Sequence, residues 1–372
     1  MKRLVLFLNF FCLSAYAVTP GETVENFRLE DHKRDSHELY YYRESKAIAF
    51  MVQGNGCPIA RNAAVDYHKL KDQYESKGIK FLMINSNLQD SVKSIRDEAQ
   101  EYEYEIPILK DETQLVGEPL LLTRTGEVFL IDTSDWKIIY SGALNDRLTY
   151  ANQKEVATKF FLENAIKSVI EGKEVDVKQT EALGCLMNFP EQRNLQKHTK
   201  ISYSDEIAPI LISNCVGCHR KGGIGPWAMT DYKMIQGFSP MIREVLRTKR
   251  MPPWHADSEV GHFSNDRSLT EKEFKTLVHW IEAGSPRGKG EDPLAKLQVS
   301  ETKWANEQIF GRPPDYVVNL PKVEIPSSGV IDYKYLTKKN PITEDIWVGG
   351  VEYSPGDSQV LHHIITSFGK NL

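Results

Sequence analysis

The stretch "AIAFMVQGNGCPIAR" (47–61) decides the fold of the N-terminal half of the chain. Its first seven residues (47–53) form an apolar run of strand length, followed by a short glycine-containing loop. Pro58 suits the first position of a helix, and the residues from 59 to 78 have helical character and end in a glycine. The stretch therefore predicts a buried strand that leads through Cys57 into a helix.

The same alternation of strand and helix continues to about residue 175 and predicts an α/β domain. The expected elements after the first helix are, in order, a strand at 79–85, a helix at 91–102, strands at 106–111, 127–132 and 137–144, and a helix at 153–171.

This order resembles the thioredoxin fold, and specifically its redoxin, or peroxiredoxin-like, branch. The segments that carry the resemblance are "GNGCPIAR" (54–61), "FLMINSN" (81–87), "PILKDETQLVG" (107–117) and "TRTGEVFLID" (123–132). The resemblance implies a redoxin domain at 18–175 with Cys57 at the active position. A cysteine just before a helix N-terminus has its thiolate favoured by the exposed N–H groups, and Arg61 would act in the same sense.

The active position lacks several usual partners. Ala60 stands where a thioredoxin has its second cysteine, Gly54 where a typical peroxiredoxin has a threonine, and Gly126 where the cis-proline is expected. Three roles for the domain stay open: catalysis by Cys57 as a nucleophile, a structural role for this cysteine, or docking on a fold that has lost its chemistry.

Cys185 is a candidate partner for Cys57. It lies in "EALGCLMNFP" (181–190), irregular chain just past the last expected helix. A structural disulfide and a resolving cysteine are both open.

A second motif, "NCVGCH" (214–219), has the spacing C-x-x-C-H. A redox dithiol needs a strand before it, but the residues at 204–213 predict a helix, and a zinc site needs two further ligands at short spacing. The motif is the signature of c-type haem attachment, with thioether links at Cys215 and Cys218 and His219 as an iron ligand.

The residues at 200–292 resemble a small monohaem cytochrome c domain, joined to the redoxin domain by a linker at 176–199. Met251, in "RTKRMPPWHAD" (247–257), is the expected second iron ligand, because the two prolines after it fix a rigid loop. The expected architecture is thus an α/β redoxin domain followed by an all-α haem domain.

The sequence pattern changes at 293–372 to short β-like runs, which predict the start of a sandwich or jelly roll. The order of these runs resembles the N-terminal part of the copper type II, ascorbate-dependent monooxygenases, which implies copper ligands at His362 and His363. The family's further ligands would lie beyond Leu372, so we do not expect monooxygenase activity from this chain alone.

The first residues predict a secretory signal peptide at 1–17: Lys2 and Arg3, a short apolar run, and a small-x-small site before cleavage after Ala17. The expected location is the periplasm. A formal charge of −5 without a basic stripe argues against nucleic acid as a partner, and no later run is long enough to span a membrane.

Together these features predict a secreted redox protein in which a haem c passes single electrons to a partner protein or copper centre. The redoxin domain is coupled to it. The alternative is a periplasmic thiol peroxidase or disulfide oxidoreductase that uses Cys57 on a small-molecule or protein substrate.

Overall fold

A computed structural model describes residues 19–148, 153–191, 194–254, 256, 260–264, 266–298, 304, 306–357, 359–361 and 364–366. The expected signal peptide and the expected copper ligands His362 and His363 lie outside these residues.

The chain divides into two compact units. The first comprises the described residues up to Ile201 together with Phe238–Pro286, and the second comprises Ser202–Gly237 and the described residues from Arg287 onward.

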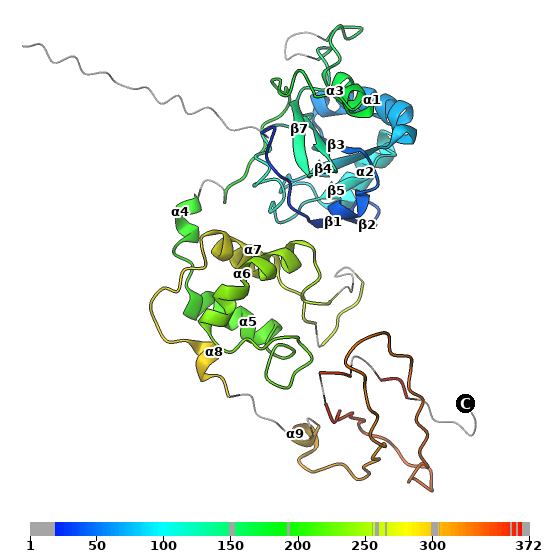
Figure 1. The fold of residues 1–372 in the computed structure, drawn as a ribbon, viewed down its shortest axis with the longest axis vertical. Helices are drawn as coiled ribbons and strands as arrows, with labels where there is room; N and C mark the ends of the chain where they lie inside the picture. Colours follow the sequence, from blue (N-terminus) through cyan, green and yellow to red (C-terminus); the bar gives the residue numbers. More distant parts are fainter. Residues whose placement is uncertain are drawn as a thin grey trace, which may run out of the picture. The chain divides into compact units, whose positions relative to one another are not determined.

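A seven-stranded mixed sheet forms the centre of the first unit, in the order β2-β1-β5-β4-β3-β6-β7 (Figure 1). Its strands are β1 (Arg28–Asp31), β2 (Ser36–Glu38), β3 (Ala47–Val52), β4 (Ile79–Asn85), β5 (Ile108–Lys110), β6 (Val128–Asp132) and β7 (Lys137–Gly142). The strands β3, β4 and β5 run parallel, whereas β6, β7, β1 and β2 pair antiparallel with their neighbours. This is the thioredoxin-like α/β arrangement that the sequence predicted.

Three helices bury apolar side chains against one face of this sheet: α1 (Pro58–Tyr74), α2 (Val92–Glu101) and α3 (Phe161–Ile170). Irregular chain containing Phe27, Leu120 and Phe189 covers the other face. All six side chains of β3 are buried, as expected for a strand covered on both faces. The start of α1, which carries Cys57, is therefore fixed by a fully buried strand.

The boundaries differ from the sequence expectation at several points. The helix α1 ends at Tyr74, and a 3-10 turn at Glu75–Lys77 (η2) leads to Gly78, whose φ of 93° needs a glycine. The helix α3 begins at Phe161, not at 153. The short strands β1 and β2 were missed, because three- or four-residue strands give too little alternation to detect.

Several short helices and two longer ones follow. They are α4 (Leu195–His198), α5 (Ala208–Asn214), α6 (Tyr232–Arg247), α7 (Glu271–Glu282), α8 (Pro293–Lys296) and α9 (Glu307–Phe310), with a π-helical turn η4 at Tyr203–Ile207. A 3-10 turn, η1 (Leu39–Tyr42), lies earlier in the chain, between β2 and β3. The helix α7 begins with a capping box, because Thr270 accepts from the Glu273 backbone and Glu273 bonds back to Thr270. Within the described part of the chain, every helix is too short or too polar to cross a bilayer.

The division into two units places Phe238–Pro286 with the redoxin part, and the expected haem domain at 200–292 stays a prediction. Side chains of the segment Phe238–Pro286 contact the redoxin part directly. Arg247 donates to the carbonyl of Leu115 across 2.8 Å, and His279 lies 3.2 Å from the Glu118 carboxylate.

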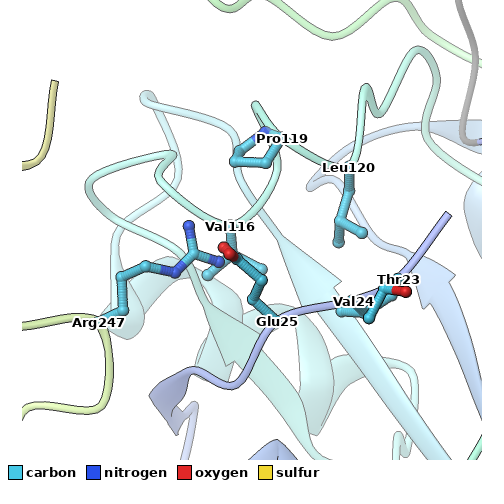
Figure 2. Close-up of a pocket in the computed structure, with 7 residues that line it drawn as sticks. All are labelled: Thr23, Val24, Glu25, Val116, Pro119, Leu120 and Arg247. Carbon is cyan, nitrogen blue, oxygen red and sulfur yellow. The ribbon is translucent and has the colours of Figure 1, made fainter. Parts of the chain in front are cut away.

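A pocket lies where Arg247 meets the redoxin part, and Figure 2 shows its lining residues. They are Thr23, Val24, Glu25, Val116, Pro119, Leu120 and Arg247. Burial lowers the pKa of Arg247. None of the cysteines lines this pocket.

The expectation of β strands at 293–372 is wrong for the described residues. No strand occurs there, and apolar side chains such as Val330 (97% exposed) and Trp347 (101% exposed) face solvent. An extended run is stable as a strand only when it pairs and buries one face, and the described residues of this segment do neither.

Candidate functional site

Cys57 lies at the N-cap of α1, directly after the loop that follows β3. Its backbone is extended, with φ −79° and ψ 114°, and Pro58 occupies the first helical turn as the sequence predicted. The residue is only 3% exposed. The thiol therefore sits at the positive end of a seventeen-residue helix and out of bulk water.

The structure brings Cys185 to Cys57. The two sulfurs are 2.9 Å apart although the residues are 128 positions apart in sequence, and Cys185 is the donor. Both cysteines are free thiols in the structure, Cys57 buried and Cys185 exposed. The pairing that was open from the sequence is thus supported by proximity.

Thr125 joins the two cysteines. Its hydroxyl donates to the Cys57 sulfur across 2.9 Å and accepts from the Cys185 backbone N–H at 3.0 Å. Its own N–H donates to the Cys185 carbonyl at 2.9 Å. Cys185 therefore lies in a short antiparallel run along Thr125, continued by the bridge between Arg124 and Leu186.

Gly184 makes this close approach possible. A Cβ at this position would lie 1.7 Å from the Thr125 carbonyl oxygen, and the φ of 158° is at the edge of the region that other residues rarely adopt. Arg124 further holds the run by donating to the Gly184 carbonyl across 3.0 Å.

The electrostatics of the two thiols differ. Burial opposes ionisation of Cys57, but hydrogen bonds from Cys185, from Thr125 and from the Ala60 backbone outweigh it and lower its pKa. The pKa of Cys185 is raised, first by its hydrogen bond to Cys57 and then by burial. When one proton leaves the pair, the thiolate therefore forms on Cys57.

Arg61, expected to assist Cys57, is held by Glu98. Its Nη2 atom lies 2.9 Å from Glu98 Oε2, and its guanidinium stacks 4.4 Å from the centre of the Tyr102 ring. Glu98 also accepts from the Gly56 backbone at 2.9 Å. The Glu98 carboxylate therefore neutralises the charge of Arg61. The Arg61 side chain is linked to the loop before Cys57 through Glu98, which accepts from Gly56.

A second carboxylate fixes the active loop. Asp90 Oδ2 accepts from the Asn55 backbone at 3.0 Å, from Asn85 at 2.8 Å and from Asn87 at 3.1 Å. Asn85 and Asn87 lie at and just after the end of β4, whereas Asn55 lies in the loop before Cys57. Asp90 therefore ties this loop to the neighbouring parallel strand. The position of the thiol is set by the sheet and not by the loop alone.

The structure explains why glycine replaces the usual threonine three residues before the cysteine. A Cβ on Gly54 would lie 2.5 Å from Thr125 Cγ2 and 2.5 Å from Asn87 Nδ2. The side chain of Thr125 occupies this space, and its hydroxyl is the one that donates to the Cys57 sulfur. Sequence reasoning missed Thr125, although it stands directly before Gly126, the expected cis-proline position.

The C-x-x-C-H motif extends α5 by a compact turn in the second unit. The N–H groups of Cys218 and His219 both donate to the Cys215 carbonyl, at 3.1 and 2.9 Å. Burial and the neighbouring Cys218 raise the pKa of Cys215 to about 12. A thiol with a raised pKa has a small thiolate fraction at neutral pH.

His219 is 9% exposed, and its Nδ1 lies 3.1 Å from the Trp227 carbonyl. This bond places the proton on Nδ1 and leaves the Nε2 lone pair for a metal. Gly225 lies against the ring, since a Cβ there would be 2.7 Å from Nδ1. The residues present thus fit a haem c: two thiols at the attachment spacing and an imidazole oriented as an iron ligand.

Met251 lies four residues beyond α6, in the first unit, and is 38% exposed. Its role as the second iron ligand stays a prediction. Among the described residues, no cluster of three or more His, Cys, Asp or Glu side chains has the geometry of a metal site.

Comparison with known proteins defines the class of the first domain. Residues 20–136 match the AhpC/TSA family, so the chain contains a thioredoxin-fold redoxin domain of the kind found in thiol-dependent oxidoreductases. The matched range includes Cys57 and Thr125, whereas Cys185 lies outside it. No curated protein matches the chain.

Solved structures similar to the chain include a hypothetical protein from Sinorhizobium meliloti 1021, at 24% identity and a TM-score of 0.42, over 46% of this chain and 95% of that one. An uncharacterized conserved protein from Geobacillus kaustophilus has 27% identity and a TM-score of 0.43, over 46% and 93%. The peroxidoxin BcpB from Mycobacterium tuberculosis has 16% identity and a TM-score of 0.32, over 41% and 96%.

Proposed function

We propose that the redoxin domain is a two-cysteine thiol–disulfide oxidoreductase in which Cys57 and Cys185 alternate between dithiol and disulfide. The observation that carries the proposal is the 2.9 Å separation of the two sulfurs, with the thiolate favoured on Cys57. A structural disulfide would need no stabilised thiolate, whereas an exchanging pair requires one.

The reaction balances as a two-electron exchange. The reduced pair gives two electrons and two protons to an external disulfide, which leaves as two thiols while the bond between Cys57 and Cys185 forms. The reverse reaction consumes two thiols and releases their disulfide. Thr125 stabilises Cys57 whenever this residue is a thiolate, because its hydroxyl donates to the sulfur.

The test is the reduction of insulin disulfides driven by dithiothreitol, with the Cys57→Ser and Cys185→Ser variants beside the unmodified chain. We expect both substitutions to abolish turnover above the dithiothreitol background. When the unmodified chain is equilibrated at increasing ratios of oxidised to reduced glutathione, the thiols of Cys57 and Cys185 should be lost together. Unchanged turnover in Cys57→Ser would refute the proposal.

A hydroperoxide is a second candidate oxidant, and the burial of Cys57 favours it. An oxidant that meets a sulfur only 3% exposed must be small, and Thr125 supplies the hydroxyl that redoxins place beside this cysteine. The peroxide O–O bond would break at Cys57, giving an alcohol or water and a sulfenic acid, and Cys185 would then form the disulfide with loss of water. Peroxide consumption by the Cys57→Ser variant decides this candidate.

We also propose that the chain carries a haem c, held by thioethers from Cys215 and Cys218, with His219 Nε2 on the iron. The hydrogen bond from His219 Nδ1 to the Trp227 carbonyl supports it, since it orients the ring for ligation. When bound, such a group supplies one-electron transfer. The haem should stay attached in denaturant after expression in a cytochrome c-maturing periplasm, and Cys215→Ala with Cys218→Ala should abolish attachment.

Attachment of a haem c takes place outside the cytoplasm, so we propose secretion to the periplasm. We also propose Met251 as the second iron ligand, and a redox protein or copper centre as electron partner. Copper at His362 and His363 is proposed only by resemblance, because these residues lie outside the described part of the chain.

A further inference from the structure

We infer that thiol and disulfide partners of the redoxin domain exchange at Cys185, and that Cys57 acts as the internal leaving and resolving thiolate. This inference rests on the proposed function of the pair. It reverses the expected roles, because Cys57 occupies the active position of the fold and was expected to meet the substrate.

Access is the first argument. Thiol–disulfide exchange requires an attacking sulfur, the attacked sulfur and the leaving sulfur to lie nearly in line. Cys57 is 3% exposed, whereas Cys185 is exposed. A partner as large as a peptide thiol can therefore react with Cys185 from solvent. It exchanges with the buried Cys57 only after it has bonded to Cys185.

The acidity of the two thiols is the second argument. Exchange is faster when the thiol that leaves has the lower pKa. The pKa of Cys57 is lowered and that of Cys185 is raised. Attack on Cys185 expels the thiolate that Thr125 and the α1 N-terminus stabilise, whereas attack on Cys57 expels the less stable one.

The backbone gives the third argument. Two hydrogen bonds with Thr125, one from the Cys185 N–H and one to its carbonyl, hold Cys185 in place on the domain. After a partner has bonded to Cys185, the Cys57 thiolate therefore remains beside the mixed disulfide. The exchange can proceed in either direction without movement of α1.

In reduction, a partner thiolate bonds to the Cys185 sulfur, the bond between Cys185 and Cys57 breaks, and Cys57 leaves as a thiolate. A second partner thiolate then attacks the partner's own sulfur, which releases Cys185 as a thiol after it takes up a proton. The partner is oxidised to a disulfide by two electrons, and the domain is reduced by two.

The direct test traps the intermediate. The full-length oxidised chain is mixed briefly with reduced glutathione, quenched with acid, alkylated with N-ethylmaleimide and mapped by mass spectrometry of its peptides. We expect glutathione on Cys185 and N-ethylmaleimide on Cys57. Glutathione on Cys57, or equal labelling of the two residues, would overturn the inference.

A second measurement uses single variants that retain one thiol of the pair. With 5,5′-dithiobis(2-nitrobenzoate) as the probe, Cys185 in the Cys57→Ser variant should react faster than Cys57 in the Cys185→Ser variant, with each modified peptide mapped. The exposure of Cys185 should outweigh the greater acidity of Cys57, because this bulky disulfide must reach a residue that is only 3% exposed to react with Cys57. A rate for Cys57 equal to or above that of Cys185 would overturn the inference. If the oxidised chain contains no peptide linking Cys57 to Cys185, the proposed function itself fails, which is a distinct result.

Discussion

The hydroxyl of Thr125 donates a hydrogen bond to the sulfur of Cys57 across 2.9 Å, although 68 positions separate the two residues. The same hydroxyl accepts from the Cys185 backbone. One side chain from the loop before β6 therefore contributes, after Cys185 itself, to the lowered pKa of the buried thiol and also holds Cys185 beside it.

Replacement of Thr125 by valine should weaken the Cys57 thiolate, because valine keeps the shape of the side chain and removes the donor. A hydrogen bond to a charged group contributes about 1.5–3 kcal/mol, so we expect the pKa of Cys57 to rise by about one to two units and the thiolate fraction below that pKa to fall roughly tenfold to a hundredfold. The measurement is the rate of iodoacetamide alkylation of Cys57 in the reduced chain. Thr125→Ser, which keeps the hydroxyl, is the matched control, and an unchanged rate in Thr125→Val would contradict this role.

The pH dependence of the same reaction should reflect the direction of the pKa shift. The pKa of Cys57 lies below its ordinary value of 9.0 in the folded chain. Because the thiolate is the reacting form, alkylation of the folded chain should reach half its maximum below that value, and in urea the midpoint should move up toward it. A midpoint at or above the unfolded one would show that burial, not hydrogen bonding, dominates.

Replacement of Arg61 by methionine should affect stability more than acidity. It removes the charged partner of Glu98, whose side chain is only 8% exposed, so we expect a loss of about 1–3 kcal/mol in the free energy of unfolding, measured in urea. The alkylation rate of Cys57 should change less than in Thr125→Val.

The double variant Arg61→Met with Glu98→Gln is the control for Arg61. It removes both charges, so it should recover part of the lost stability. If Arg61→Met lowers the alkylation rate as much as Thr125→Val does, Arg61 acts on the thiolate directly and the assignment of its charge to Glu98 is wrong.

An alanine at Gly54 should disturb the site by crowding. Its Cβ would lie 2.5 Å from both Thr125 Cγ2 and Asn87 Nδ2, so one of these must move. We expect a loss of about 1–3 kcal/mol in the free energy of unfolding, together with slower alkylation of Cys57. The addition of Thr125→Ser, which removes the crowded methyl group, should restore part of the stability, and a strictly additive double variant would contradict the steric explanation.

An alanine at Gly225 tests the orientation of His219. The new Cβ would lie 2.7 Å from Nδ1, so the ring must rotate or shift and its bond to the Trp227 carbonyl must weaken. We expect a changed absorption spectrum of the haem-loaded chain. The control is Gly237→Ala within α6, where the Cβ meets no atom within 4 Å and the spectrum should be unchanged.

The sequence by itself determined the redoxin fold and the place of Cys57 at a helix start. The runs that became β3, β4, β6 and β7 carry strand signals that are local in the chain, and Cys57 before Pro58 marks a helix start. The spacing of Cys215, Cys218 and His219 is likewise a local pattern. Signals of this kind depend only on residues that are neighbours in the sequence, so they can be recognised without knowledge of the fold.

Only the tertiary structure decided which residues complete the thiol site. Thr125 and Cys185 reach Cys57 because β6 lies beside β3 and because the chain past α3 returns along Thr125. Sequence spacing carries no information on such distances. The same limit explains the error at 293–372, where alternating apolar residues predicted strands: a strand requires a partner and a covered face, and both are properties of the folded chain.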